Sequence, residues 1–252
     1  MAPEIPILPV FENLPGIRAF FTTRQGGISI GPYASLNLGH LSGDNPETVD
    51  KNWSLLLEAK GFGGHGLALP RLCHGAVSAE VGAPENVAPA ESLEAVDAVF
   101  TQSDKWVLAV TMADCLPALI ADPATRCVAA VHAGWRGTRD RILEITLQRL
   151  FSEGRCNPAT TYVTFGPCLS TFALEISEDV AVLLPQRHVH RDKGRYYFDL
   201  RGANRAQALD AGVPPGNITE SPICTRENEA LCFSYRRDGG VTGRMAACIG
   251  LL

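Results

Sequence analysis

The sequence predicts an α+β protein in which layered mixed β-sheets are flanked by helices within a single domain. Short apolar segments typical of buried strands outnumber the segments with helical periodicity. The two kinds of segment do not alternate regularly, as the strands and helices of a doubly wound parallel fold do. No repeat, low-complexity tract or charged linker divides the 252 residues, so we expect one domain over residues 1–252.

The first predicted helix runs from about Pro46 to Lys60. Asn45 can cap its first turn, proline suits the first helical position, and Gly61 can end the helix in the left-handed conformation. A second helix is expected from about Thr138 to Phe151, because apolar residues recur there at helical spacing. Two more helices are expected, one after Ser177 and one from about Arg201 to Ala211.

Short segments rich in apolar and β-branched residues are predicted as strands. They are Trp106–Ala113, Leu116–Ala121, Cys127–His132, Thr161–Phe165, Tyr196–Phe198, Leu231–Tyr235 and Met245–Ile249. Gly61, Gly63 and Gly66 match the GxGxxG pattern of dinucleotide-binding proteins. They follow a predicted helix, whereas the phosphate-binding version follows a strand, so we interpret this segment as a loop.

Composition narrows the class of protein. Hydrophobic residues make up 46% and charged residues 19% of the chain, which is typical of a globular protein with a substantial core. The net charge of −5 and the scattered arginines predict no nucleic-acid partner. No stretch reaches the roughly 18 to 20 apolar residues of a membrane span, and the N-terminus lacks an export signal. We therefore expect a cytoplasmic protein whose eight dispersed cysteines are reduced.

Cys115 and His132 lie at the ends of two apolar strands that follow one another in the chain. Neighbouring strands that end on the same edge of a sheet would bring these side chains together, and the loop containing His74 could fold over that edge. Two imidazoles and a thiolate suit zinc, and three protein ligands leave the open position of a catalytic site. Spacing alone leaves open that each of the three is an ordinary core or surface residue.

Several motifs occur in an order that resembles one bacterial family. They include FTTRQGGISIGPYASLNLGH at Phe21–His40, ADC, HAGWRG and FSYRRD. The family was first described as multicopper polyphenol oxidoreductases or laccase-like proteins and later as purine nucleoside phosphorylases with adenosine deaminase activity; its relatives include peptidoglycan editing factors. The resemblance implies layered mixed sheets with helices outside. It also implies that His74, Cys115 and His132 bind the metal, for which one zinc ion per chain suits the ligands better than copper.

Other residues are candidates for catalysis and substrate binding. Arg136 lies in the turn Gly134–Gly137, which leads into a predicted helix and could bind phosphate or serve only as a tight turn. Asp114 could orient a metal-bound histidine, act as an acid or base, or hydrogen-bond its own loop. The family pattern suggests four residues as substrate contacts: Arg24, Asn37, Ser234 and Arg236. Leu72 stands where the family usually has glutamine, two residues before the first histidine ligand.

The leading functional hypothesis is phosphorolysis of purine nucleosides such as adenosine, inosine or methylthioadenosine, with deamination of adenosine at the same site. A nucleoside and phosphate would be the small-molecule partners of a monomer or homodimer. The first alternative is a cysteine- or metal-dependent amide hydrolase that edits peptidoglycan precursors, with Cys115 as nucleophile and His132 as base. A copper-dependent polyphenol oxidase with Met112 as axial ligand is the second, although six histidines are too few for four coppers. A non-catalytic binding module is the third.

Overall fold

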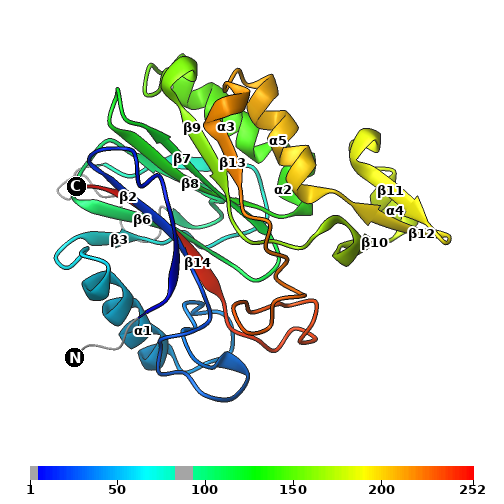
Figure 1. Ribbon diagram of the computed structural model, residues 1–252, viewed down its shortest axis with the longest axis horizontal. Helices are drawn as coiled ribbons and strands as arrows, with labels where there is room; N and C mark the ends of the chain where they lie inside the picture. Colours follow the sequence, from blue (N-terminus) through cyan, green and yellow to red (C-terminus); the bar gives the residue numbers. More distant parts are fainter. Residues whose placement is uncertain (1–4, 83–92) are drawn as a thin grey trace.

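Two β-sheets packed face to face form the centre of the molecule, in a computed structural model that describes residues 5–82 and 93–252 (Figure 1). The six-stranded sheet contains, in spatial order, β13 (Ile218–Glu220), β9 (Tyr162–Phe165), β7 (Leu116–Asp122), β8 (Cys127–Ala133), β5 (Ala98–Thr101) and β4 (Ser78–Glu80). The five-stranded sheet contains β1 (Ile7–Val10), β2 (Ile17–Thr22), β14 (Met245–Leu251), β6 (Trp106–Met112) and β3 (Gly66–Ala68). Both sheets mix parallel and antiparallel pairs, which confirms the predicted fold class.

The alternation of side chains along each strand divides the core into layers. On β7, Leu119 and Ala121 face the other sheet, whereas Ala118 and Ile120 belong to the cluster beneath the helices. Because both faces of the sheet are covered, all seven residues of β7 are buried. This two-sided burial explains why the central strands are continuous apolar runs in the sequence.

Helices cover the outer face of each sheet. Helix α1 (Pro46–Ala59) lies on the five-stranded sheet and buries Trp53 and Leu56 there. As predicted, the Asn45 side chain caps it by accepting hydrogen bonds from two backbone N–H groups. Helices α3 (Ile142–Ser152) and α5 (Leu200–Asp210) pack on the six-stranded sheet. The molecule is therefore a single four-layer domain with helices on both outer faces.

Two sequence predictions need correction. The helix expected from Thr138 to Phe151 is interrupted, because Arg141 adopts a left-handed conformation with φ of 61° between α2 (Trp135–Arg139) and α3. The strand expected at Leu231–Tyr235 is instead irregular, with turns on either side of residues 232–234. Cys232 and Phe233 are buried beneath the loop that contains them, so their apolar pattern reflects packing and not strand pairing.

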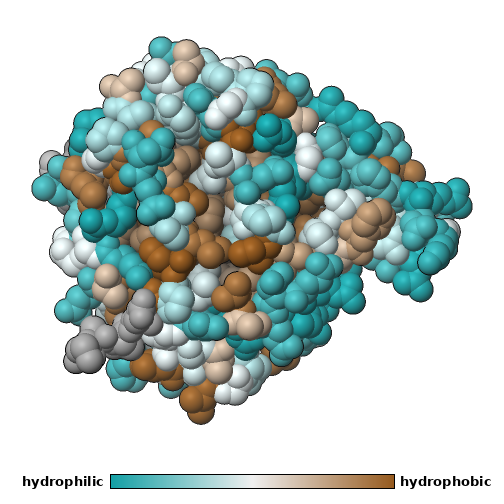
Figure 2. All heavy atoms as spheres, in the orientation of Figure 1, coloured by the Kyte–Doolittle hydropathy of each residue, from teal (hydrophilic) through white to brown (hydrophobic). Residues whose placement is uncertain are grey.

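A small sheet projects from the main body, at the right of Figure 1. It consists of β10 (Glu175–Ile176), β12 (Arg195–Phe198) and β11 (Val189–Asp192), with α4 (Glu178–Ala181) beside them. Figure 2 shows that the surface of this projection is largely hydrophilic, whereas apolar residues gather across the middle of the same view. Within the described ranges, no helix combines the length and the hydropathy needed to cross a membrane.

Candidate metal centre and its cavity

The candidate site lies where the chain crosses from one central sheet to the other. β6 ends at Met112 in the five-stranded sheet, and β7 begins at Leu116 in the six-stranded sheet, so only residues 113–115 make the crossing. β8 runs antiparallel to β7, with Pro117 opposite His132. The end of β8 therefore lies at the same edge as Cys115, which precedes β7.

The three ligands that the sequence suggested meet at this edge. One donor atom each from His74, Cys115 and His132 lies within 4.8 Å of the other two. The imidazole rings of His74 and His132 are edge to face, with centroids 4.9 Å apart. A thiolate and two imidazoles form a donor set typical of zinc, and three ligands leave a fourth position open.

The local backbone also leaves room for an ion. A Cβ at Gly134 would lie 3.0 Å from Cδ2 of His74 and 3.1 Å from Sγ of Cys115, so a side chain there would crowd both ligands. A Cβ at Gly137 would lie 2.8 Å from the backbone oxygen of Gly75, next to His74. The glycines of the HAGWRG motif thus allow α2 to approach the His74 loop closely, and the residues present fit a metal.

Asp97 connects two of the candidate ligands, and sequence reasoning gave it no role. Its Oδ1 lies 2.9 Å from Nδ1 of His132 and also accepts a hydrogen bond from the backbone N–H of His74 at 3.0 Å. Its Oδ2 accepts hydrogen bonds from the backbone N–H of Gly75 at 2.7 Å and of Cys73 at 3.3 Å. One buried carboxylate therefore orients the His132 ring and fixes the loop that carries His74.

Electrostatics within this group favour charged side chains. Burial alone would raise the pKa of Cys115, but the charge and hydrogen bond of His132 outweigh it and lower the value to about 6. Burial would lower the pKa of His132, yet the Cys115 thiolate and Asp97 raise it to about 9. Burial would raise the pKa of Asp97, but the hydrogen bond and charge of His132 lower it to about 2. A thiolate is therefore available to bind a metal or to act as a nucleophile.

The donor group opens into a cavity of about 750 Å³. This volume is within the range of small-molecule sites, which are usually clefts of about 300–1,000 Å³. Much of its wall is apolar; the aliphatic and aromatic lining residues include Leu38, Leu41, Leu69, Leu72, Trp135, Leu169, Leu174, Leu200 and Tyr235. Leu72, the residue that departs from the family pattern, thus contributes an apolar surface and not a polar contact.

Cationic side chains complete the wall: Arg71, Arg136, Arg236 and Arg244. Arg136 is exposed, and its guanidinium carbon lies 4.3 Å from the centre of the Trp135 ring. Helix α2, which begins at Trp135, contains Arg136 and Arg139; Arg139 pairs with Asp140, and Arg136 is the one that lines the cavity. His40 also lines the cavity and pairs with Asp50 at 2.7 Å.

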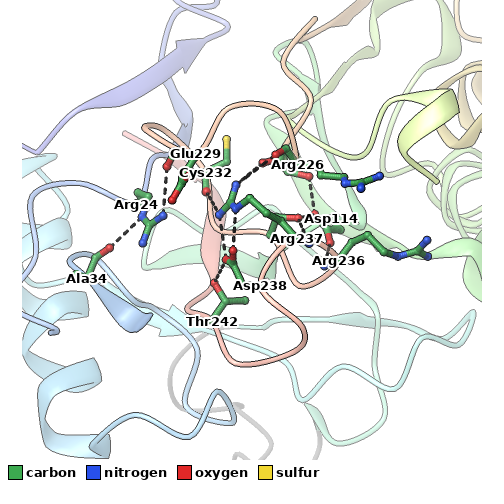
Figure 3. Close-up of polar contacts among 12 residues, drawn as sticks. Arg24, Ala34, Asp114, Arg226, Glu229, Cys232, Arg236, Arg237, Asp238 and Thr242 are labelled. Atoms are coloured by element: carbon green, nitrogen blue, oxygen red, sulfur yellow. Dashed lines mark hydrogen bonds and ion pairs between the residues drawn. The ribbon is translucent and has the colours of Figure 1, made fainter. Parts of the chain in front are cut away.

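Asp114 lies next to Cys115 and binds the C-terminal loop (Figure 3). Its Oδ1 accepts hydrogen bonds from the hydroxyls of Thr225 and Ser234 at 2.6 and 2.7 Å, and its Oδ2 accepts one from the backbone N–H of Arg236 at 2.6 Å. These bonds hold Asp114 at a φ of 106°, which is unusual for a residue other than glycine. The carboxylate that orients His132 is Asp97 and not Asp114.

Of the four substrate contacts suggested by the family pattern, only Arg236 lines the cavity. Arg24 donates hydrogen bonds to the backbone oxygens of Ala34 and Glu229, which ties the N-terminal loop to the C-terminal one (Figure 3). Ser234 is buried and donates to Asp114, and the buried Asn37 hydrogen-bonds backbone and side-chain groups around it. These three residues support the cavity wall from behind.

Comparisons with known proteins cover nearly the whole chain. Residues 18–252 match a family model described as multi-copper polyphenol oxidoreductase laccase. A purine nucleoside phosphorylase of Deinococcus radiodurans is 39% identical, over 99% of this chain and 94% of its own. An adenosine deaminase of an unknown prokaryotic organism is 31% identical, over 96% of each. The crystal structure of the hypothetical protein YfiH from Bacillus licheniformis has a TM-score of 0.91 at 28% identity, covering 99% of this chain and 97% of that one.

Proposed function

The chain belongs to the multi-copper polyphenol oxidoreductase laccase family, and from this premise we propose that it is a zinc-dependent purine nucleoside phosphorylase with adenosine deaminase activity. The observation that carries the proposal is the open His74–Cys115–His132 donor set at the wall of a nucleoside-sized cavity that also contains arginines. Relatives named for these two activities support it. The same substrates, a soluble nucleoside and phosphate, fit a cytoplasmic enzyme.

The cavity offers separate surfaces for the parts of a nucleoside and for phosphate. Leucines and the half-buried Trp135 provide an apolar wall suited to a purine ring. Arginine guanidinium groups on the wall suit the phosphate anion, because their N–H donors match pairs of phosphate oxygens. We assign Arg136 to phosphate at the outer part of the cavity and Arg236 to the substrate. We assign Asp114 to hold the loop that carries Arg236.

In phosphorolysis, a phosphate oxygen forms a bond with the sugar C1′ while the bond between C1′ and purine N9 breaks. The electron pair of that bond stays with the purine, which takes a proton and leaves, so the products are the free base and ribose 1-phosphate. In deamination, a water oxygen bonds to C6 of adenine and ammonia leaves. Bound zinc would supply Lewis-acid chemistry. The protein orients His132 through Asp97, positions His74 by the same carboxylate, and surrounds the substrate with an apolar wall.

The test is to separate the products of adenosine by chromatography, with and without inorganic phosphate, using protein loaded with one equivalent of zinc. We expect adenine and ribose 1-phosphate only when phosphate is present, and inosine in both conditions. Adenine release that does not depend on phosphate would contradict phosphorolysis. A copper-loaded sample that oxidises phenols while the zinc-loaded sample leaves nucleosides intact would favour the oxidase alternative.

A cysteine hydrolase is the second candidate, because one geometric feature favours it. Cys115, His132 and Asp97 are arranged as nucleophile, base and orienting carboxylate: donor atoms of Cys115 and His132 lie within 4.8 Å of each other, and Asp97 accepts a hydrogen bond from Nδ1 of His132. This arrangement would suit amide hydrolysis, such as editing of a peptidoglycan precursor, and it does not need His74. His74→Ala that retains peptide-amide hydrolysis, together with inactivation of the zinc-loaded protein by iodoacetamide at Cys115, would support this candidate.

A further inference from the structure

Arg244 differs from the other arginines of the cavity in its surroundings. It immediately precedes β14 and is half-buried, whereas Arg71, Arg136 and Arg236 are exposed. Burial lowers the pKa of Arg244 from its usual value. A guanidinium that is withdrawn from water and makes no direct ion pair is unfavourable, so such a group favours binding of an anion.

The hydrogen bonds of Arg244 leave part of the guanidinium free. Its Nη1 donates to the backbone oxygens of Thr242 and Gly243 at 2.8 and 3.0 Å. In the described part of the chain, no ion pair joins Arg244 to a carboxylate, and neither Nε nor Nη2 makes a hydrogen bond. By contrast, Arg71 lies 3.5 Å from a carboxylate oxygen of Glu94. Arg244 therefore retains the paired N–H donors that bind two oxygens of a phosphate.

Neighbouring residues fix the backbone of Arg244 and pack against its side chain. The buried Asn37 accepts hydrogen bonds through Oδ1 from the backbone N–H groups of Arg244 at 2.8 Å and Gly39 at 3.0 Å. Leu38 donates from its backbone N–H to the Arg244 oxygen at 2.9 Å, so the two segments pair closely. A Cβ at Gly39 would overlap Cγ of Arg244 and lie 2.8 Å from its Cβ. The guanidinium carbon of Arg244 lies over the aromatic ring of Tyr235, 5.5 Å from the centre of that ring.

We propose that Arg244 is the principal phosphate-binding residue of the cavity, and that Asn37 and Gly39 position it. This inference rests on the proposed phosphorolysis and identifies which group binds its nucleophile. The guanidinium binds two phosphate oxygens through Nε and Nη2, which leaves a third oxygen to attack C1′. Asn37 acts through Arg244 and does not contact the substrate, because both of its Oδ1 hydrogen bonds are made to the backbone.

The first test measures binding of inorganic phosphate to the zinc-loaded protein by titration calorimetry, and therefore needs no assumption about the reaction. We expect Arg244→Met to weaken phosphate binding roughly 10- to 100-fold, the effect of losing charge-assisted hydrogen bonds to an anion. Arg71→Met is the matched control. It also removes a guanidinium from the cavity wall, but that guanidinium is already paired with Glu94. Unchanged phosphate affinity in Arg244→Met, or an equal loss in both variants, would overturn the assignment.

Gly39→Ala tests the positioning role while retaining the arginine. The added methyl group would displace the Arg244 side chain, so phosphate affinity should fall while zinc content stays the same. In steady-state assays, Arg244→Met and Gly39→Ala should both raise KM for phosphate. KM for the nucleoside should change little, and phosphate-independent deamination should be largely retained. If phosphorolysis itself is absent, the calorimetry still decides whether Arg244 binds phosphate. Gly39→Ala with the phosphate affinity of the wild type would remove the positioning role.

Discussion

The carboxylate of Asp97 accepts a hydrogen bond from Nδ1 of His132 at 2.9 Å while also binding the backbone N–H of His74. Two of the three candidate ligands thus depend on one buried side chain, which is 23 residues from one ligand and 35 from the other in the sequence. A metal bound here would be held by ligands whose orientation is already fixed in the fold.

Asp97→Asn should therefore weaken zinc binding roughly 10- to 100-fold, the usual effect of losing a partner of a metal-bound histidine. An asparagine keeps the size of the side chain but has only one acceptor oxygen for the five donors that Asp97 serves, which include the Cys73 thiol. Competition with a chelating dye would measure the affinity. Asp104→Asn, which changes an exposed aspartate, is the control. Wild-type zinc affinity in Asp97→Asn would show that the three ligands need no such support.

Metal content is the second prediction. Protein expressed without added metal should contain close to one zinc per chain by elemental analysis, because thiolate and imidazole ligands suit that ion. His74→Ala and Cys115→Ala should each lose the metal. The Cys115 thiol should also resist alkylation until zinc is removed by a chelator, whereas the exposed Cys73 should react in both states. Several copper ions per chain would contradict the assignment.

Gly134→Ala is expected to lower zinc affinity roughly 10-fold or more, although it changes no ligand. The new methyl group would lie within about 3 Å of His74 and Cys115, so one of the ligands must move. Gly63→Ala is a suitable control, because a Cβ there would meet no atom within 4 Å. Thermal unfolding of the two metal-free proteins should be similar, which would separate crowding of the metal from loss of the fold.

The strands and helices that were predicted correctly are those whose apolar pattern or cap lies within one continuous segment of the sequence. β6, β7 and β8 are seven-residue strands with six apolar residues each, and α1 has its own capping residue. The strands that were missed in the small sheet have only two to four residues, too few to show a period. The Leu231–Tyr235 segment gave a false strand because burial beneath a loop produces the same apolar pattern.

The site was predicted only in part for a related reason. The resemblance suggested the ligands, but Asp97 lies 23 residues from His74 and 35 from His132, and no local pattern joins them. Arg244 also depends on a distant contact, because Asn37 is 207 residues away. The DAVFT segment that contains Asp97 was the available signal, but an aspartate before a strand has too many common roles for the segment alone to identify this one.

Substitution of Asp114 distinguishes a structural role for this carboxylate from a catalytic one. If the carboxylate holds the C-terminal loop, Asp114→Asn should lower the free energy of unfolding by about 3 kcal/mol, because an amide cannot accept all three hydrogen bonds. Thr225→Val removes one of the same bonds and should cost about 1 kcal/mol. Both variants should raise KM for the nucleoside in proportion to their loss of stability. Loss of kcat in Asp114→Asn alone, at unchanged stability, would instead indicate an acid or base.

Substitution of Arg136 should affect phosphorolysis more than deamination. Arg136 lines the cavity but is exposed and stacked on Trp135, so its contact with phosphate competes with water more than that of a buried cation does. We expect Arg136→Ala to raise KM for phosphate roughly 10-fold, near the lower limit for a charge-assisted contact. Deamination uses water and should be nearly unaffected. Rates of adenine and inosine formation across a phosphate series would measure both. An equal loss of the two activities would assign Arg136 to the nucleoside or to the turn, and would leave phosphate to the inner part of the cavity.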